Sequence, residues 1–265
     1  MDKTIELVNN IKDIQAMPSV IVKVLNVMKK PTVSMKELGD IVMYDQSLTI
    51  KILALVNSAY YGFSQQISSI QIALSLLGMV KVKNIIVAVA MKPMMSNAGD
   101  KELWKHSIRV AAGCEYLAKL TKVMDADEAF IAGFIHDVGK IVLHTTNPKM
   151  YGKVIELVNA GQPILDIEKK YFDSDHVKTG SLLAKRWQLP ILLANIISYH
   201  HNPSLSSIPV PCNLVCAVDK LMQDVFNPNL LDKDFMKTMG IALDDVEELR
   251  NVIWQKADLL ISELT

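Results

Sequence analysis

The sequence has few cysteines, few aromatic residues and no net charge. Its 265 residues include three cysteines and 6% aromatic residues, and 28 lysines and arginines balance 28 acidic residues. So few cysteines, in odd number, exclude the disulfide framework of a small secreted domain. A neutral chain without a basic stripe also lacks the cation excess typical of nucleic-acid binding proteins. We therefore expect a reduced, cytoplasmic protein, and we do not expect nucleic acid as its partner.

Long apolar runs are missing as well. The first ten residues, MDKTIELVNN, lack the apolar segment of an export signal, and the most apolar runs, 85–91 and 191–197, are far too short to cross a bilayer. Hydrophobic residues nevertheless make up 50% of the chain, which suffices for a large buried core. The composition predicts a globular chain that crosses no membrane, built as one large domain or as two lobes.

The helical period of apolar residues runs through nearly the whole chain. Alternating stretches are few, and no Asn-Gly or Asp-Gly hairpin turn occurs. Ser34 and Glu37 form a capping-box pattern at a helix start. Gly78 follows a helical pattern, at the position where a C-terminal cap is needed, and residues 127–144 have the pattern of one uninterrupted helix. The sequence predicts an all-α fold.

A shift of composition divides the chain. After Lys92-Pro93 and two methionines comes the polar run 96–100, Ser-Asn-Ala-Gly-Asp, which is typical of a connection between two units. We therefore predict a two-lobed helical protein, with an N-terminal lobe over 1–95 and a C-terminal lobe over 96–265.

One of the six histidines is followed by an aspartate inside an apolar helical pattern. His136-Asp137 lies within Phe134 to Lys140, FIHDVGK. Burying an imidazole beside a carboxylate is costly unless a partner holds both, and a divalent cation accepts both as ligands. The dipeptide alone also occurs by chance. Cys212 and Cys216, four residues apart, could likewise hold a metal, although buried thiols are the more common case.

The segment FIHDVGK resembles the signature of the HD superfamily, in which the His-Asp dipeptide binds metal. The superfamily pattern adds an upstream histidine and a downstream aspartate, which His106 and Asp219 supply. The chain resembles the HDOD family, the HD-related output domain of bacterial signalling proteins, more closely still, over roughly residues 15–220. That resemblance is carried by Ala16-Met17-Pro18, Asp45-Gln46-Ser47-Leu48, Asn57-Ser58-Ala59-Tyr60, Ile70-Gln71-Ile72-Ala73 through Gly78, Trp187-Gln188-Leu189-Pro190 and His200-His201.

The resemblance implies a metal site and two candidate catalytic residues. Carried over, one divalent metal would be held by four residues: His106, His136, Asp137 and Asp219. Three further histidines match the positions that hold a second metal in the related HD-GYP phosphodiesterases: His176, His200 and His201. Lys140 matches a lysine that contacts substrate phosphate there, so Lys140 and Asp137 are the candidate catalytic residues. Mixed His and Asp donors suit Fe, Mn, Zn, Ni or Co, so the identity of the metal and its number, one or two, stay open.

Each of these residues also has an ordinary structural alternative. A histidine or aspartate can be satisfied inside a helical core, and histidines at a helix end favour the helix dipole when protonated. Asp219 could pair with Lys220, and Lys140 could reach solvent along its stem. His144 matches no position of the family, and we expect it to be structural.

The sequence departs from the HD-GYP pattern after the paired histidines. Asn202-Pro203-Ser204-Leu205 stands where those enzymes have an acidic residue and a Gly-Tyr-Pro loop, so hydrolysis of cyclic di-GMP is not expected. Two hypotheses follow. The first, which the resemblance favours, is a regulatory output module that binds a signalling protein or a small nucleotide-like ligand. The second is a metal-dependent phosphohydrolase acting on a nucleotide or cyclic nucleotide, in which the cation activates water and Lys140 neutralises phosphate charge. The pattern gives no oligomeric state.

Overall fold

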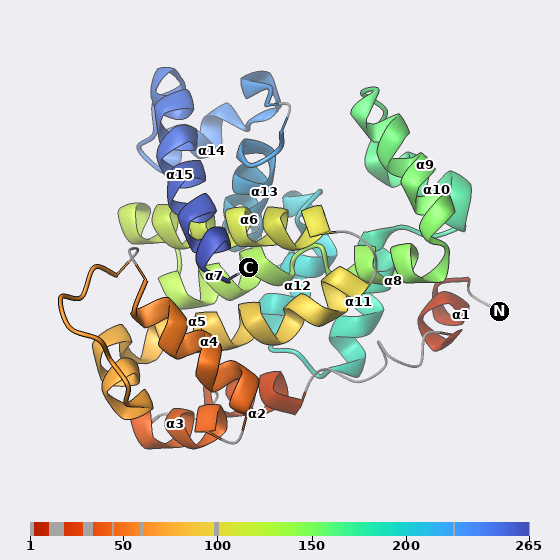
Figure 1. Ribbon diagram of the computed structural model, residues 1–265. Helices are drawn as coiled ribbons and strands as arrows, with labels where there is room; N and C mark the ends of the chain where they lie inside the picture. Colours follow the sequence, from red (N-terminus) through yellow and green to blue (C-terminus); the bar gives the residue numbers. More distant parts are fainter. Residues whose placement is uncertain are drawn as a thin grey trace.

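The computed structural model describes residues 3–10, 19–28, 34–43, 45–58, 61–97, 101–224 and 226–264. Within these ranges every regular element is an α-helix or a short 3₁₀ turn, and no strand occurs (Figure 1). The all-α prediction is confirmed. Two segments that carried part of the family resemblance, Ala16-Met17-Pro18 and Ala59-Tyr60, lie outside the described residues.

The first part of the chain supplies the helices drawn from red to yellow in Figure 1. They are α1 (Lys3–Asn10), α2 (Ser19–Met28), α3 (Met35–Met43), α4 (Gln46–Val56) and α5 (Ile70–Asn97). The expected capping box precedes α3: the Glu37 amide donates to Ser34 Oγ at 3.2 Å, and the Ser34 amide donates to Glu37 Oε2 at 3.4 Å.

Helix α5 is two helices joined at a bend. Gly78 has φ 78° and ψ 159°, a conformation open only to glycine, and the axes on either side differ by 106°. The expected stop at Gly78 is therefore confirmed. The second half runs past Pro93 to Asn97, and residues 98–100 lie outside the described residues.

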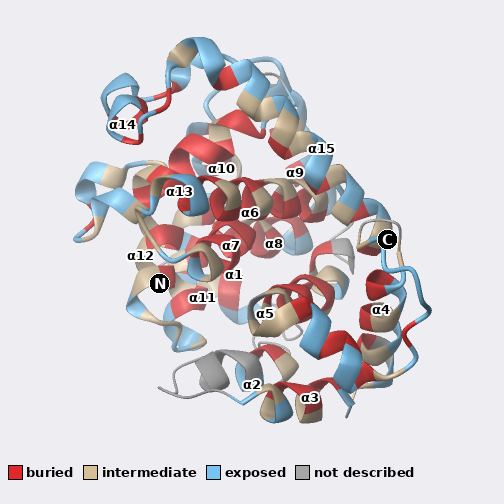
Figure 2. Ribbon diagram, turned by 90° about the vertical axis from the view of Figure 1, so that its left-hand side faces the viewer, coloured by how far each residue is buried: buried red, intermediate tan, exposed pale blue. Residues whose placement is uncertain are grey.

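The second part of the chain continues with helices that surround α6 and α7. They are α6 (Lys101–Thr121), α7 (Ala126–Ile135), α8 (Val138–Thr146), α9 (Pro148–Asn159), α10 (Ile164–Phe172), α11 (His176–Arg186), α12 (Ile191–Tyr199), α13 (Pro209–Leu221), α14 (Lys233–Thr238) and α15 (Val246–Leu264). Short 3₁₀ turns, η2 (Pro203–Leu205), η3 (Pro228–Leu230) and η4 (Leu243–Asp245), lie between the later helices. Figure 2 shows that α6 and α7 carry mostly buried residues at the centre of the molecule.

The prediction of one helix over 127–144 is wrong. The segment forms α7 and α8, which meet at His136 and Asp137, and Asp137 leaves the helical conformation with φ −96° and ψ 14°. Apolar periodicity did not reveal the break because residues on both sides of it, such as Phe134 and Val138, are fully buried. The break lets α8 start against α11, where Gly139 passes so close that a Cβ would lie 1.9 Å from the His176 carbonyl oxygen.

The first helix, α1, packs mainly against helices of the C-terminal part of the chain. Helix α1 lies against α11 and α8 (Figure 1), and the hydroxyls of Thr4 and Ser174 are hydrogen bonded at 2.8 Å. The division into lobes over 1–95 and 96–265 stays a prediction. Among the described helices, no single one is long and apolar enough to span a membrane; only the two halves of α5, taken together across their bend, meet the criteria of length and composition.

Candidate metal centre

All seven residues predicted as metal ligands lie in one place. His106 comes from α6, His176 begins α11, His200 and His201 follow α12, and Asp219 comes from α13. His136 and Asp137 occupy the junction of α7 and α8. Their nitrogen and oxygen atoms form two groups that share Asp137, and within each group the atoms lie within 4.8 Å of one another. The structure brings these side chains together, while their role as ligands stays a prediction.

The first group combines two histidines with two aspartates. His106 Nε2 lies 3.0 Å from Asp219 Oδ1 and 3.8 Å from Asp137 Oδ2. His136 Nε2 lies 3.2 Å from Asp137 Oδ2 and 3.6 Å from Asp219 Oδ1. Burial would lower the pKa of His136, but the charges of Asp137 and Asp219 outweigh burial and raise the pKa to about 10. The field at this point strongly favours a positive charge.

The second group places three imidazoles around the other oxygen of Asp137. Asp137 Oδ1 lies 3.4 Å from His176 Nε2 and 3.6 Å from His200 Nε2. The Nε2 atom of His176 also lies 3.0 Å from that of His201 and 3.4 Å from that of His200. Burial, joined by the neighbouring histidines, lowers the pKa of His201 to about 2, and burial lowers the pKa of His200 as well. Neutral imidazole is the form that binds a metal.

Hydrogen bonds at Nδ1 orient the rings of His136 and His200 so that Nε2 faces the site. His136 Nδ1 contacts the Gly133 carbonyl at 2.7 Å, and His200 Nδ1 contacts the carbonyls of Ile196 and Ile197 at 3.2 Å. When Nδ1 donates to a carbonyl, Nε2 keeps its lone pair for a metal. The local fold therefore sets the tautomer that a ligand needs.

Glu168 on α10 performs this function for His176, and the sequence analysis missed it. This fully buried carboxylate accepts hydrogen bonds from the His176 ring Nδ1 at 2.7 Å and from its backbone amide at 2.8 Å. The Tyr151 hydroxyl donates to its other oxygen at 3.1 Å. The only signal in the sequence is an acidic residue beside Ile167, on the buried face of α10.

The unsatisfied polar atoms of the site indicate whether it fits a divalent cation. Within the described residues, His136 Nε2 and Asp137 Oδ1 are buried and have no hydrogen-bond partner. Leaving such groups unpaired costs about 1–3 kcal/mol each. Both atoms point among mixed imidazole and carboxylate donors, which is the ligand chemistry of Fe, Mn, Zn, Ni or Co. The residues present therefore fit a divalent metal.

Lys140 lies in the first turn of α8 and is directed to the site. Its ammonium bonds Asp137 Oδ2, and its side chain is only 16% exposed. Burial would lower the pKa of Lys140, but the charges of Asp137 and Asp219 leave the pKa raised. The alternative in which Lys140 extends into solvent is therefore wrong.

The remaining candidates lie outside the two groups. Cys212 and Cys216 are buried, and burial raises the pKa of both thiols, as expected of inert core cysteines. His144 stacks on Tyr151 with ring centroids 5.2 Å apart. Asp219 bonds His106, which removes the simple alternative of pairing with Lys220.

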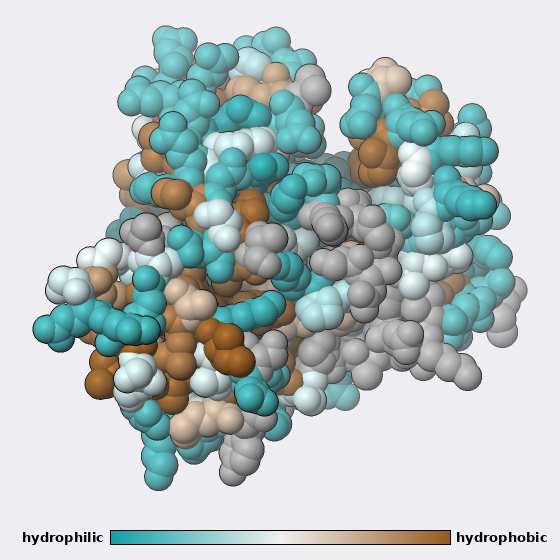
Figure 3. All heavy atoms as spheres, in the orientation of Figure 1, coloured by the Kyte–Doolittle hydropathy of each residue, from teal (hydrophilic) through white to brown (hydrophobic). Residues whose placement is uncertain are grey.

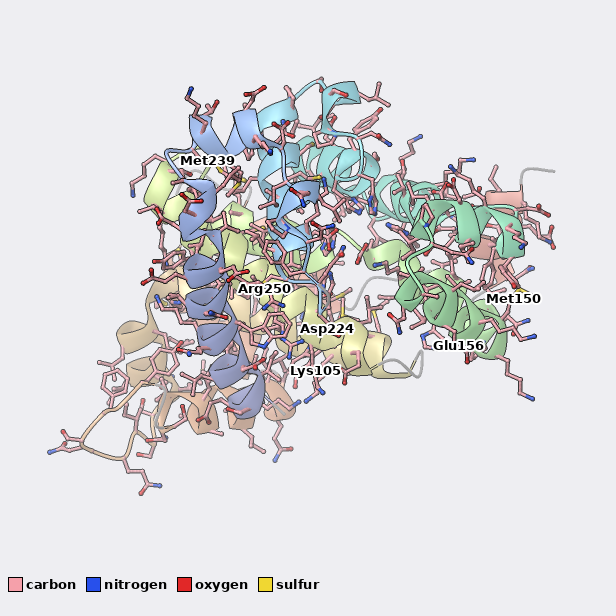
Figure 4. All side chains as sticks on the ribbon, turned by 90° about the horizontal axis from the view of Figure 1, so that it is seen from above. Lys105, Met150, Glu156, Asp224, Met239 and Arg250 are labelled. Carbon is pink, nitrogen blue, oxygen red and sulfur yellow. The ribbon has the colours of Figure 1, made fainter. Side chains whose placement is uncertain are left out.

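The exposed edge of the site includes His106 on α6, Asp219 on α13, Lys140 on α8 and the half-buried His201. The side chains of His106 and Asp219 are 21% and 10% exposed, whereas His136, His176 and His200 are closed off. Figure 3 shows the surface hollowed between the α13–α15 block and the α9–α10 pair, above the start of α6. Figure 4, viewed from above, shows Lys105 and Asp224 on one side of this hollow and Met150 and Glu156 of α9 on the other.

Comparison with known proteins shows which family and which solved structures the chain resembles. The model of the HDOD domain matches residues 14–203. An uncharacterized protein of Treponema pallidum (strain Nichols) is 29% identical over 203 residues, which are 74% of this chain and 39% of that protein. The chain thus spans two fifths or less of the length of the curated relatives it matches.

Two solved structures resemble the chain along its whole length. An HDOD domain protein of unknown function from Geobacter sulfurreducens superposes with a TM-score of 0.79 at 22% identity, over 95% of this chain and 96% of that one. A proposed phosphohydrolase from Shewanella amazonensis SB2B superposes with a TM-score of 0.72 at 21% identity, over 99% and 98%. At such identities the likeness shows the fold alone.

Proposed function

Because the chain belongs to the HDOD family, we propose that it is a bacterial signal-transduction module that holds a divalent metal and binds a phosphate-bearing, nucleotide-like ligand beside it. The observation that carries the proposal is the convergence of seven donors around Asp137, with buried atoms left for a cation. The exposed edge at His106 and Asp219 is the side from which a ligand would enter.

The chain's own residues divide the work of binding such a ligand. His136, His176 and His200 are held by hydrogen bonds through Nδ1 and present Nε2 to the centre. Lys140 keeps an ammonium beside the carboxylate that both groups share, so it can exchange that contact for a phosphate oxygen. A bound divalent cation would polarise phosphate oxygens and acidify water. Because the donors come from α6, α11, α13, the α7–α8 junction and the end of α12, occupancy would bias how these helices pack.

Metal analysis of untagged protein tests the first part of the proposal. The protein is loaded in turn with Mn, Fe, Zn, Ni or Co, dialysed, and analysed for retained cation. We expect one or two equivalents with at least one of these metals, and loss of retention in Asp137→Ala, which removes the residue common to both groups. His144→Phe removes a buried histidine outside the site and should retain the wild-type amount. Protein that retains no cation after any loading would overturn the proposal.

A second candidate function, a metal-dependent phosphohydrolase, is favoured by the position of Lys140 against Asp137. With cyclic di-GMP we expect no multiple turnover by the metal-loaded protein, because Asn202-Pro203 replaces the Gly-Tyr-Pro loop. Steady turnover of this or another nucleotide, abolished in His136→Ala and reduced in Lys140→Ala, would instead make hydrolysis the function. The variant Lys185→Ala, on α11 and outside both ligand groups, is the control for general loss of activity.

A further inference from the structure

A cavity of about 550 Å³ lies between α5, α6, α7 and α15, separate from the metal centre. Its volume is within the range of about 300–1,000 Å³ typical of small-molecule sites. None of the seven candidate metal ligands lines it. Its walls are mostly apolar, with Ile85 and Ala88 from α5 and Phe130 from α7 among them.

One polar side chain is buried in this wall without a partner. Asn84 on α5 is 3% exposed, and within the described residues neither its amide nitrogen nor its amide oxygen has a hydrogen-bond partner. The nitrogen is a donor and the oxygen an acceptor. Both atoms are closed to water in this conformation, so a ligand in the cavity that offers an acceptor and a donor side by side would pair them once the Asn84 side chain turns toward it.

The cavity also carries an excess of positive charge. Its charged lining residues are Lys81, Lys119, Lys256 and Glu115, so three cations against one carboxylate leave two positive charges unbalanced. Lys81 Nζ lies 3.4 Å from Glu115 Oε1, and Lys119 bonds the same oxygen. Lys256 Nζ lies over the Tyr116 ring, 4.5 Å from its centroid. The single charge of Glu115 therefore neutralises only one of the two lysines that contact it. A bound anion would neutralise the remaining positive charge.

We propose that this cavity binds a nucleoside phosphate, with the base against Asn84 and the phosphate among the lysines. A nucleobase has adjacent donor and acceptor atoms that an Asn amide can pair in a bidentate manner. Its flat faces suit Phe130 and Tyr116, and its phosphate supplies the missing negative charge. An aliphatic carboxylate would satisfy the lysines but would leave the Asn84 amide unpaired, so it fits the cavity less well.

Calorimetric titration with AMP, GMP, CMP and UMP tests the proposal. We expect at least one of the four to bind wild-type protein, and to bind Asn84→Leu at least tenfold more weakly. The double variant Lys81→Ala, Lys119→Ala should weaken the same binding by a similar factor. Asn84→Leu removes an unpaired buried amide, so it is expected to fold at least as stably as wild type, and thermal unfolding checks this directly.

Two further measurements separate this site from the metal centre and from a lipid pocket. Asp137→Ala should lose retained metal yet bind the nucleotide as wild type does, so the cavity proposal and the metal proposal can fail independently. Palmitate should bind more weakly than the preferred nucleotide. The proposal is overturned if none of the four nucleotides binds at millimolar concentration, if binding is unchanged in Asn84→Leu, if it is lost in Asp137→Ala, or if palmitate binds more tightly.

Discussion

Glu168 belongs to neither group of candidate metal ligands, yet it orients one of them, His176. Its carboxylate receives the ring Nδ1 and the backbone amide of His176. Removing a hydrogen-bond partner of a metal-binding histidine typically lowers metal affinity about 10–100-fold. We therefore expect Glu168→Gln to weaken metal binding by that factor, measured by titration against a competing chelator.

The control for this experiment is Glu156→Gln, which neutralises an exposed glutamate on α9 (Figure 4). It removes the same charge from the molecule without touching a histidine, so metal affinity should stay at the wild-type value. Equal affinities for Glu168→Gln and wild type would mean that the contact to His176 is structural only.

Gly139 is required for a different reason, the close approach of two backbones. A Cβ at this position would lie 1.9 Å from the His176 carbonyl oxygen and 2.6 Å from the Gly180 nitrogen, which are backbone atoms that cannot rotate away. Overpacking of this kind costs about 1–3 kcal/mol. Gly139→Ala should therefore lower the free energy of unfolding by that amount, measured by urea denaturation.

The matched substitution is Gly152→Ala in α9. A Cβ there meets nothing within 4 Å, and replacing an exposed helical glycine by alanine stabilises by about 0.5–1 kcal/mol. The two glycine variants should therefore change stability in opposite directions, and a loss of stability in both would contradict the packing argument.

At the scale of single residues, the sequence predicted the seven converging side chains but not the groups that orient them. Four of these residues match positions of a family pattern that is defined by residues able to bind metal: His106, His136, Asp137 and Asp219. Glu168 and Gly139 act through a hydrogen bond and a close contact with His176. Those relationships exist only once α8, α10 and α11 are packed, so no spacing along the chain indicates them.

Among the elements, the bend in α5 depends on the conformation of one glycine. Gly78 has φ 78° and ψ 159°, and nothing lies within 4 Å of where its Cβ would be. The cost of a side chain there is therefore one of backbone strain alone, about 1–3 kcal/mol. We expect Gly78→Ala to lower the thermal midpoint accordingly.

Ser75→Ala, three residues earlier on the same helix, is the reference for this variant. Ser75 is exposed and donates only to the Gln71 carbonyl of its own helix, so alanine should leave stability unchanged or slightly improved. A Gly78→Ala protein as stable as Ser75→Ala would show that the bend tolerates a side chain.

The two helix breaks differ in the residues at which the chain turns, and this difference explains why only the break at Gly78 was predicted. Gly78 separates two helical patterns and is itself a residue that ends helices. The break at Asp137 carries no glycine or proline at the point where the chain turns, and the apolar pattern continues across it. Here the packing of α8 beside α11 determines where the helix breaks, and the apolar periodicity does not. The same packing places Asp137 between the two groups of histidines.

At the scale of the whole molecule, the candidate metal centre is the point where separate parts of the chain meet. The α7–α8 junction, helices α6, α11 and α13, and the residues that follow α12 each contribute a donor, although they span residues 106 to 219. In this cluster His136 Nε2 and Asp137 Oδ1 are buried and form no hydrogen bond within the described part of the chain. A metal that binds this arrangement and not the unfolded chain therefore stabilises the whole fold.

Metal loading should accordingly raise the thermal midpoint. At a free metal concentration of 100 times Kd, one site contributes about 2.7 kcal/mol, which corresponds to roughly 5 °C or more for a chain of this size. We expect this shift in scanning calorimetry on adding the metal that the protein retains, and its reversal by EDTA. Asp137→Ala should melt at the same temperature with and without metal, because both groups lose their common carboxylate. His144→Phe should melt at a changed temperature but keep the full metal-dependent shift, since its ring lies outside both groups. A shift of equal size in Asp137→Ala would place the stabilising cation elsewhere on the molecule.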